Sequence, residues 1–489
     1  MRVDELLAQR ASGRPSKTAL VCGSVRLTYA EVDEQARRIG RVLHAAGVAP
    51  LDRVAVCLEN SADAVAWIFG VLKAGAVFFV VNPQARLEYR NQLIRDSGAA
   101  AVVERDAEGR PFITRITNPH RRGPFAHDMD ADLAALVYTS GSTGTPKGVM
   151  LTHRNLTFAA ESICTYLQNT ADDVILSVLP LSFTYGLGQV TTALHAGATL
   201  VLEPSFTYPR AVLDTMRRER VTGFPIVPTI ATLLLQQDLG MHRLPHLRYV
   251  TNAAAALPLG KMQRLRSAFP HADIFLMYGL TECQRASYLP PGLINQCPDS
   301  VGVPIPGTSV EVVDEDGRPV GPGIVGELVV RGPHVMKGYW NDAEATAQVL
   351  RPDGDSGDML LYTGDLFRTG ANRLLYFVER RDDVIKVRGE KVAPRQIEEV
   401  IARLPGVADV SVYGIPDDVA GEAIAAAVKP CDGVTLTADD IRRHCHAHLE
   451  PFMVPKVVDV RATLPTTTSG KVSRRALRLL TRPRGASAA

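Results

Sequence analysis

The chain has 489 residues, 46% of them hydrophobic and 22% charged, which is enough to bury several hydrophobic cores in roughly three domain-sized units. Its 54 basic and 52 acidic residues give a formal net charge of +2, so no basic surface for nucleic acid is indicated. No apolar run reaches the roughly 20 residues of a membrane helix, and the first residues are too charged for a signal peptide. We therefore expect a cytoplasmic protein without a transmembrane segment.

The first half of the chain repeats one pattern of helix, glycine stop and apolar strand. Residues 61–83 predict a helix that stops at Gly75 and a strand closed by Asn82 and Pro83. The same order returns in residues 188–204, with the stop at Gly197. Further helices and strands are expected in the ranges 210–228, 247–252, 257–269 and 272–279. Apolar strands that alternate with helices predict an α/β fold of layered subdomains with mostly parallel sheets.

The pattern changes after Gly302. Residues 303–332 predict short antiparallel strands separated by glycine and proline, which would form a small β-barrel-like part. From Val384 onward we expect a smaller α+β unit, with helices at 393–404 and 437–450 and strands at 408–415 and 422–430. We place the boundary in the charged run at 379–383. This gives an N-terminal domain of residues 1–379, a hinge at 380–383 and a C-terminal domain of residues 384–489.

A loop rich in glycine and hydroxyl side chains lies within residues 136–153, after an expected strand at 133–140 and before a helix with Thr152 as N-cap. This is the carboxyl edge of the sheet, where open α/β folds bind ligands. Glycines let backbone N–H groups approach a phosphate, hydroxyls donate to its oxygens, and Lys147 adds a positive charge. The spacing does not fit a Walker A loop, and a flexible Gly/Ser linker is the alternative. The candidate phosphate-binding residues are Thr139, Ser140, Gly141, Ser142, Thr143, Gly144, Thr145 and Lys147.

Four other strings are weak singly but informative together: MYGLTE at 277–282, YTGDL at 362–366, ERRDDVIKVRGEKV at 379–392 and TTTSGKVSRRAL at 466–477. In this order and at these separations, they and the loop resemble the adenylate-forming superfamily. That superfamily includes acyl-CoA synthetases, adenylation domains of non-ribosomal peptide synthetases and firefly luciferase. The resemblance covers nearly the whole chain and implies a large domain that binds AMP and the acyl group, followed by a small mobile C-terminal domain.

The resemblance implies a reaction in two steps. A carboxylate attacks the α-phosphorus of MgATP to give an acyl-adenylate and pyrophosphate, and a thiol then displaces AMP. Because the first step brings negative charges together, cations and donors placed around the phosphates must stabilise it. Lys471 would bridge the carboxylate and the α-phosphate, Thr281 would donate to that phosphate, and Glu282 would bind Mg²⁺. The implied cofactors are ATP, Mg²⁺ and either CoA or the phosphopantetheine of a carrier protein.

Other matching positions would hold the nucleoside. Tyr278, followed by Gly279, would lie against the adenine. Asp365 would accept hydrogen bonds from both ribose hydroxyls, and Arg380 would help hold the nucleotide.

The second step implies a different orientation of the small domain. Asp382 matches the hinge position about which that domain turns. Lys471 would withdraw, and the loop that contains Gly389 would then line a tunnel for the thiol.

The expected acyl pocket combines two strings, at 179–190 and 252–259. Amino-acid-activating relatives commonly place an aspartate in the first string, where this chain has residues 182–185, Ser-Phe-Thr-Tyr. A buried ammonium without a partner would be costly, so we expect a fatty or other apolar acid, although an amine anchored from another position stays open. The candidate pocket residues are Phe183, Tyr185, Asn252, Ala254, Ala255 and Leu280.

The acceptor of the acyl group is expected to be CoA, with a phosphopantetheinyl carrier protein as the alternative. A luciferase-like oxidoreductase would share the adenylate but then use oxygen. A nucleotide-binding scaffold without catalysis is a third possibility, and the presence of Lys471, Glu282 and Asp365 together speaks against it.

Overall fold

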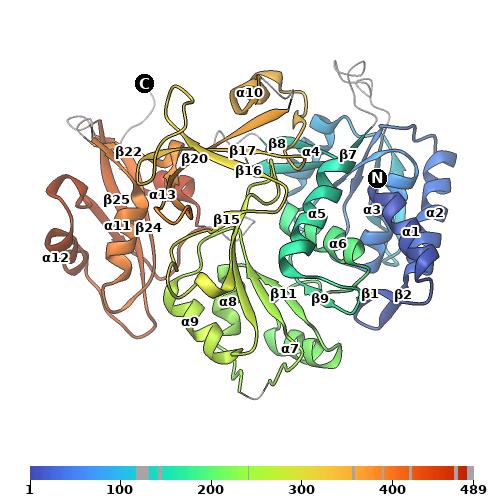
Figure 1. Ribbon diagram of the computed structural model, residues 1–489, viewed down its shortest axis with the longest axis horizontal. Helices are drawn as coiled ribbons and strands as arrows, with labels where there is room; N and C mark the ends of the chain where they lie inside the picture. The colour runs from blue at the N-terminus through green and yellow to red at the C-terminus, as the bar shows by residue number, and fades with distance from the viewer. Residues whose placement is uncertain are drawn as a thin grey trace. The chain divides into compact units, whose positions relative to one another are not determined.

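The computed structural model describes residues 1–116, 132–140, 146–240, 242–354, 358–387, 390–417, 421–466 and 472–481 (Figure 1). They form two compact units. The first unit comprises Met1–Glu311 and Val329–Thr363, and the second comprises Val312–Leu328 and the described residues from Gly364 onward. These bounds differ from those of the predicted domains, and the predicted hinge at 380–383 stays a prediction.

One sheet of the first unit has seven strands in the order β18-β8-β7-β4-β3-β5-β6. Its centre is parallel, because β3 pairs in parallel with β4 and β5, and β4 pairs in parallel with β7. Antiparallel pairs flank the centre: β6 on β5, β8 on β7 and β18 on β8. The strands are β3 (Arg53–Val56), β4 (Val77–Val80), β5 (Ala101–Arg105), β6 (Pro111–Arg115), β7 (Leu133–Ser140), β8 (Pro146–Thr152) and β18 (Gly338–Tyr339).

The other large sheet has nine strands in the order β15-β14-β13-β12-β11-β9-β10-β1-β2. The six central strands run parallel to one another: β1, β10, β9, β11, β12 and β13. The edge strands pair antiparallel, with β2 at one edge and β14 and β15 at the other. The strands are β1 (Thr18–Cys22), β2 (Val25–Thr28), β9 (Val174–Ser177), β10 (Thr199–Leu202), β11 (Gly223–Ile226), β12 (Tyr249–Asn252), β13 (Asp273–Tyr278), β14 (Ser287–Leu289) and β15 (Val303–Pro304). The prediction of a mixed α/β fold with mostly parallel sheets is confirmed.

Helices cover these sheets, and α1, α2 and α3 pack against one another (Figure 1). The helices of the first unit are α1 (Val3–Gly13), α2 (Tyr29–Ala45), α3 (Ala62–Lys73), α4 (Leu87–Ser97), α5 (His153–Leu167), α6 (Thr184–Ala196), α7 (Pro209–Arg218), α8 (Pro228–Leu234), α9 (Leu259–Ala268), η1 (Pro291–Leu293) and α10 (Ala343–Val349).

Local sequence explains several helix ends. Helix α6 ends at Gly197, whose φ of 71° is the left-handed conformation that glycine adopts at low cost. Gly75, just after α3, has a φ of 69°. The Thr152 side chain accepts a hydrogen bond from the backbone N–H of Asn155 and so caps α5. Both repeats of helix, glycine stop and strand, and the Thr152 cap, are therefore confirmed.

A five-stranded sheet follows in the chain, in the order β16-β17-β20-β19, with β21 paired to β20. Strand β20 runs antiparallel to both β19 and β21. The strands are β16 (Ser309–Val313), β17 (Val325–Arg331), β19 (Leu350–Pro352), β20 (Met359–Thr369) and β21 (Leu375–Arg380). The short strands expected in residues 303–332 correspond to β15, β16 and β17.

The second unit contains a smaller α+β body with the sheet order β23-β22-β25-β24 and β26 paired to β25. Ile397, Val412 and Ile441 are fully buried in its core. The elements are η2 (Arg381–Asp383), β22 (Ile385–Val387), β23 (Glu390–Val392), α11 (Pro394–Ala402), β24 (Val407–Asp417), β25 (Gly421–Pro430), α12 (Ala438–His448), η3 (Pro451–Met453), β26 (Val457–Val460) and α13 (Arg474–Thr481). The predicted helices and strands of this region are confirmed. Across the described ranges, no helix has both the length and the hydrophobicity to cross a membrane.

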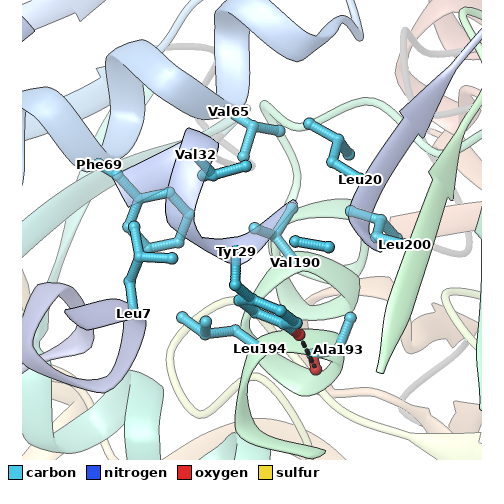
Figure 2. Close-up of a pocket in the computed structure, with 11 residues that line it drawn as sticks. Leu7, Leu20, Tyr29, Val32, Val65, Phe69, Val190, Ala193, Leu194 and Leu200 are labelled. Atoms are coloured by element: carbon cyan, nitrogen blue, oxygen red, sulfur yellow. Dashed lines mark hydrogen bonds between the residues drawn. The ribbon is translucent and has the colours of Figure 1, made fainter. Parts of the chain in front are cut away.

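A cavity of about 30 Å³ lies inside the first unit, among apolar side chains of α1, α2, α3 and α6 (Figure 2). Leu7, Val65 and Leu200 are among its walls. The Tyr29 hydroxyl at its edge already donates to the carbonyls of Ala193 and Ala198, at 3.3 and 2.7 Å. A space of this size holds about two water molecules at most and offers them few polar partners. It is a packing void of the core and is too small for an acyl chain.

Candidate active site

The predicted phosphate-binding loop lies between two antiparallel strands. In the register of β7 and β8, Thr139 lies opposite Lys147 and Ser140 lies opposite Pro146. Because β7 is parallel to β4, its end lies at the carboxyl edge of the parallel strands, as predicted. Gly141, Ser142, Thr143, Gly144 and Thr145 lie outside the described residues, as does the side chain of Ser140.

The helix predicted to follow this stretch is present as α5, but a strand that was not predicted from the sequence lies between the loop and the helix. Residues 146–152 form β8, in which Val149 and Leu151 are fully buried while Lys147 and Met150 are half-buried. The segment is a strand because it pairs with β7 on one side and with β18 on the other. Lys147 is therefore held on a strand at the loop's end.

Tyr339 joins two of the predicted site residues. Its hydroxyl donates to Oε1 of Glu282 at 2.8 Å, and the ammonium of Lys147 lies 5.0 Å from the centre of its ring. The ring is buried, because β18 pairs with β8 and places Tyr339 opposite Val149. Lys147 and Glu282, which are 135 positions apart by their numbers, thus contact one side chain. Tyr339 was not predicted from the sequence, since a strand of two residues leaves no periodic pattern.

The turn that carries Glu282 is folded tightly after β13. The Glu282 carbonyl accepts from the backbone N–H of Met336 at 2.7 Å. A Cβ on Gly279 would lie 2.5 Å from the carbonyl oxygen of Gln284, so no larger residue fits there without a shift of the backbone. Tyr278 and Thr281, which lie just before and just after this close approach in the chain, are half-buried. The turn therefore holds the predicted nucleotide-binding residues in a fixed loop.

Glu282 suits the predicted role of a magnesium ligand. Its carboxylate is half-buried, and Tyr339 orients one of its oxygens. Hard carboxylate oxygens are the donors that Mg²⁺ prefers, and protein sites for Mg²⁺ with ATP commonly use one or two carboxylates together with phosphate oxygens. The described residues contain no cluster of three or more His, Cys, Asp or Glu side chains that could hold a metal by itself. A shared site with ATP phosphates fits this arrangement.

In the second unit the structure brings Asp365 and Arg380 together. They are opposite each other in β20 and β21, and the Arg380 Nε lies 3.1 Å from Oδ1 of Asp365. Asp365 is buried, whereas the Arg380 side chain is 58% exposed. Gly364 has a φ of 70°, and its N–H donates to Glu327 at 2.9 Å. Glu327, which was not predicted from the sequence, also pairs with Arg381 at 3.0 Å.

Three further predicted residues are only partly described. Lys471 and Gly389 lie outside the described residues. Asp382 lies in η2, and its side chain is likewise outside what the structure describes. Their roles stay predictions.

The predicted acyl-pocket residues lie at the carboxyl ends of the parallel strands of the nine-stranded sheet. The Tyr185 hydroxyl bonds to Thr251, at 3.0 Å from its carbonyl oxygen and 2.8 Å from its Oγ1. Asn252 is buried and donates to the Ala255 carbonyl at 2.9 Å. Phe183 and Leu280 are half-buried, whereas Ala254 and Ala255 are exposed.

Arg285 is another residue of this region that was not predicted from the sequence. It lies three positions after Glu282, is 5% exposed, and its guanidinium carbon lies 4.9 Å from the centre of the Tyr185 ring. Burial raises the pKa of Tyr185 to about 12, although the positive charge of Arg285 opposes the rise. Tyr185 therefore stays a neutral hydroxyl throughout the physiological range.

Another cavity of the first unit, about 120 Å³ in volume, lies elsewhere. It is lined by residues of α9, η1 and the first residues of β13, including Arg266 and His271. Strand β13 begins at Asp273 and reaches the predicted site only at Tyr278. This cavity is therefore at the opposite edge of the sheet from the predicted site.

Comparisons with known proteins agree with the geometry. Residues 7–340 match the model of the AMP-binding enzyme family, and residues 396–471 match that of the AMP-binding enzyme C-terminal domain. Feruloyl-CoA synthase from an Amycolatopsis species is 34% identical over 95% of this chain and 96% of its own length. A linear gramicidin synthase from Brevibacillus parabrevis is 31% identical over 97% of this chain, which covers 6% of that protein.

A solved structure is similar over almost the full length. O-succinylbenzoate CoA synthetase from Bacillus subtilis, in complex with its acyl-adenylate intermediate, has a TM-score of 0.84 and 27% identity, with 97% of each chain covered. The family models alone match more than half of the chain. The chain thus belongs to the AMP-binding enzyme family, whose members are AMP-forming ligases.

Proposed function

We propose that this protein uses ATP to convert a carboxylic acid to an acyl-adenylate and then transfers the acyl group to the thiol of CoA. The observation that carries the proposal is the contact of Lys147 and Glu282 with the same tyrosine, Tyr339, beside the predicted phosphate-binding loop. A cation and a carboxylate that contact the same side chain suit a triphosphate and its magnesium ion. The similarity to feruloyl-CoA synthase over almost the whole chain supports CoA as acceptor.

Each residue would have a distinct part in the first step. Lys147 would neutralise charge on the phosphates, and Glu282 would hold Mg²⁺, which when bound spreads the charge that develops as pyrophosphate leaves. Asp365 would accept hydrogen bonds from the ribose hydroxyls, with Arg380 beside it. Lys471 would bridge the attacking carboxylate and the α-phosphate. Without these groups the attack would bring like charges together unscreened.

The acid would pack against Tyr185 and Phe183 at the carboxyl ends of the parallel strands. Aromatic walls favour an acid with an aryl or alkyl body, as expected from the sequence. Loading of a carrier protein is the second candidate, and the similarity to a linear gramicidin synthase supports it.

The test is product formation from ATP, Mg²⁺ and single acids of fatty, aryl and amino types, with either CoA or a phosphopantetheinyl carrier protein. Mass spectrometry would detect the thioester, and the proposal expects equimolar AMP and acyl-CoA. A thioester found only on the carrier protein would favour the second candidate. Release of ADP in place of AMP, or no thioester with any acid, would reject both.

The role of Tyr339 has a matched control. In Tyr339→Phe the hydroxyl that orients Glu282 is lost, so we expect a higher Mg²⁺ concentration for half-maximal activity, by about 10-fold or more, the equivalent of one hydrogen bond to a charged group. Tyr138→Phe removes a comparable bond, from the Tyr138 hydroxyl to Asp96 at 2.6 Å, and should leave the Mg²⁺ requirement unchanged. Equal shifts in both variants would contradict the assignment of Glu282.

A further inference from the structure

Arg285 is a buried cation that no carboxylate of the described chain neutralises. It is 5% exposed, and its Nε is sealed from solvent without a hydrogen-bond partner among the described residues. The centre of the Tyr185 ring lies 4.9 Å from its guanidinium carbon, and the Tyr166 hydroxyl is also near it. Burial raises the pKa of Tyr166, and the positive charge of Arg285 opposes that rise. A cation–π contact offsets only part of the cost of burying a charge that has no partner of opposite sign.

Another buried arginine of the first unit shows how the fold satisfies such a group when its role is structural. Arg53 is 2% exposed and lies over the Trp340 ring at 5.0 Å, much as Arg285 lies over Tyr185. Unlike Arg285, it donates to three backbone carbonyls, those of Ser97 and Gly98 at 2.8 Å and of Leu51 at 3.2 Å. The structure gives Arg285 no such set of acceptors among the described residues.

A second polar atom without a partner lies at the end of the neighbouring strand. Oδ1 of Asn252 is buried and accepts no hydrogen bond from the described residues, although Nδ2 of the same side chain is satisfied. Asn252 follows Thr251, to which the Tyr185 hydroxyl bonds. Buried polar groups are almost always hydrogen-bonded, so the unpaired Nε of Arg285 and the unpaired Oδ1 of Asn252 each need an explanation. Asn252 and Thr251 are successive residues of β12, so their side chains lie on opposite faces of the strand, and Tyr185 meets the side chain of Thr251.

We propose that Arg285 selects acids that carry a second oxygen-bearing group, a carboxylate or a phenolic hydroxyl, remote from the carboxylate that is activated. That oxygen would accept from the guanidinium and supply the acceptor that the described residues do not provide for its Nε. This inference rests on the proposed function, because it assigns Arg285 to the acid that packs against Tyr185. From the sequence, an apolar acid is expected. The inference adds that this acid carries a polar group at the end remote from the activated carboxylate.

The experiment compares three acids with one carbon framework: cinnamate, 4-hydroxycinnamate and 4-carboxycinnamate. A second set, octanoate and suberate, asks the same question on an alkyl frame. Acid-dependent ATP–pyrophosphate exchange gives kcat/KM for each acid. In the wild-type protein we expect at least one oxygen-bearing acid to exceed its unsubstituted parent by about 10- to 100-fold, the equivalent of one hydrogen bond to a charged group. The substituent that gives the larger increase in kcat/KM, carboxylate or hydroxyl, is the group that Arg285 binds.

The variants address Arg285 itself. Arg285→Met should reduce the ratio between oxygen-bearing acid and parent to about one, and Arg285→Lys should keep part of the ratio for a carboxylate. If Arg285→Met does not fold, the ratio measured for Arg285→Lys tests the inference in its place. Arg38→Met, at an exposed position of α2, removes a charge of the same sign and should leave the ratio as in the wild type.

The outcomes separate the inference from the proposed function. Exchange that favours the unsubstituted parents, or a preference that persists in Arg285→Met, would overturn the selection by Arg285 while leaving acid activation in place. No exchange with any acid, across both sets and amino acids, would reject the proposed function and the inference together.

Discussion

Arg474 in the second unit lies among three carboxylates, whereas Arg285 in the first unit has none beside it among the described residues. The guanidinium of Arg474 pairs with Glu379 at 3.2 Å, Asp383 at 2.8 Å and Glu398 at 3.0 Å. Burial alone would lower the pKa of Arg474, but the three negative charges raise it above its usual value. Arg285 is more deeply buried, at 5% exposure, and has an aromatic ring in place of a carboxylate.

The difference separates two uses of a buried charge. The carboxylates around Arg474 come from β21, η2 and α11, so this arginine joins α13 to three other elements of its unit. Its partners are internal, and its role is complete in the protein by itself. Arg285 joins no comparable network within the described chain, and its missing partner is the reason for assigning it to a ligand.

The largest expected effect is that of Arg474→Met on stability. Removing the cation leaves the buried Glu379 and the half-buried Asp383 and Glu398 without it, and breaking such a buried pair commonly costs about 3–5 kcal/mol. Urea denaturation should show this loss in the second unit. The control is Arg442→Met, which removes only an ion pair with the 82%-exposed Asp439 and should change stability by less than about 1 kcal/mol. Equal stability of Arg474→Met and Arg442→Met would contradict a structural role for Arg474.

His334 shows how a buried group can avoid an unpaired charge, which arginine cannot do. Burial lowers the pKa of His334 to about 4. The unfolded chain binds a proton at its ordinary pKa of about 6.5 while the folded chain does not, so stability falls as the pH drops from 6.5 toward 4. For one such histidine the loss is about 2 kcal/mol between pH 7 and pH 5. Urea denaturation at the two pH values should show a smaller loss in His334→Phe than in the wild type, and an unchanged loss would reject this account.

The smallest expected effect is that of Arg285→Met on the stability of the protein without substrate. Because no carboxylate is left behind, we expect the free energy of unfolding to stay within about 1 kcal/mol of the wild-type value or to rise. This sharpens the comparison, since the same substitution at Arg474 should be strongly destabilising. A loss of about 3 kcal/mol or more in Arg285→Met would show that Arg285 has an internal partner and a structural role.

The parts of the fold that could be predicted are those that nearby residues determine. The helix stops at Gly75 and Gly197 and the cap at Thr152 depend on residues within one turn of the helix. The carboxyl-edge location of the loop after β7 followed from the order of strand and helix alone. Such features need no knowledge of distant contacts.

The remaining features depend on pairing between distant segments. Strand β8 forms because it pairs with β7 and β18, whereas the sequence pattern indicated only a loop leading to a helix. Tyr339 reaches Glu282 because a two-residue strand places it there. Arg285 is an ordinary polar residue in the sequence, and only its burial without a carboxylate makes it a candidate. The family motifs identified most site residues by resemblance, but they gave no sign of these two.

The central claim is that the protein joins an organic acid to AMP. It is tested most directly by ATP–pyrophosphate exchange without any thiol, for the wild-type protein and for Lys471→Ala. We predict exchange that requires both Mg²⁺ and a suitable acid and that falls by about 10²-fold or more when Lys471 is removed. Exchange that proceeds equally without an acid, or that is absent with every acid, would contradict the account.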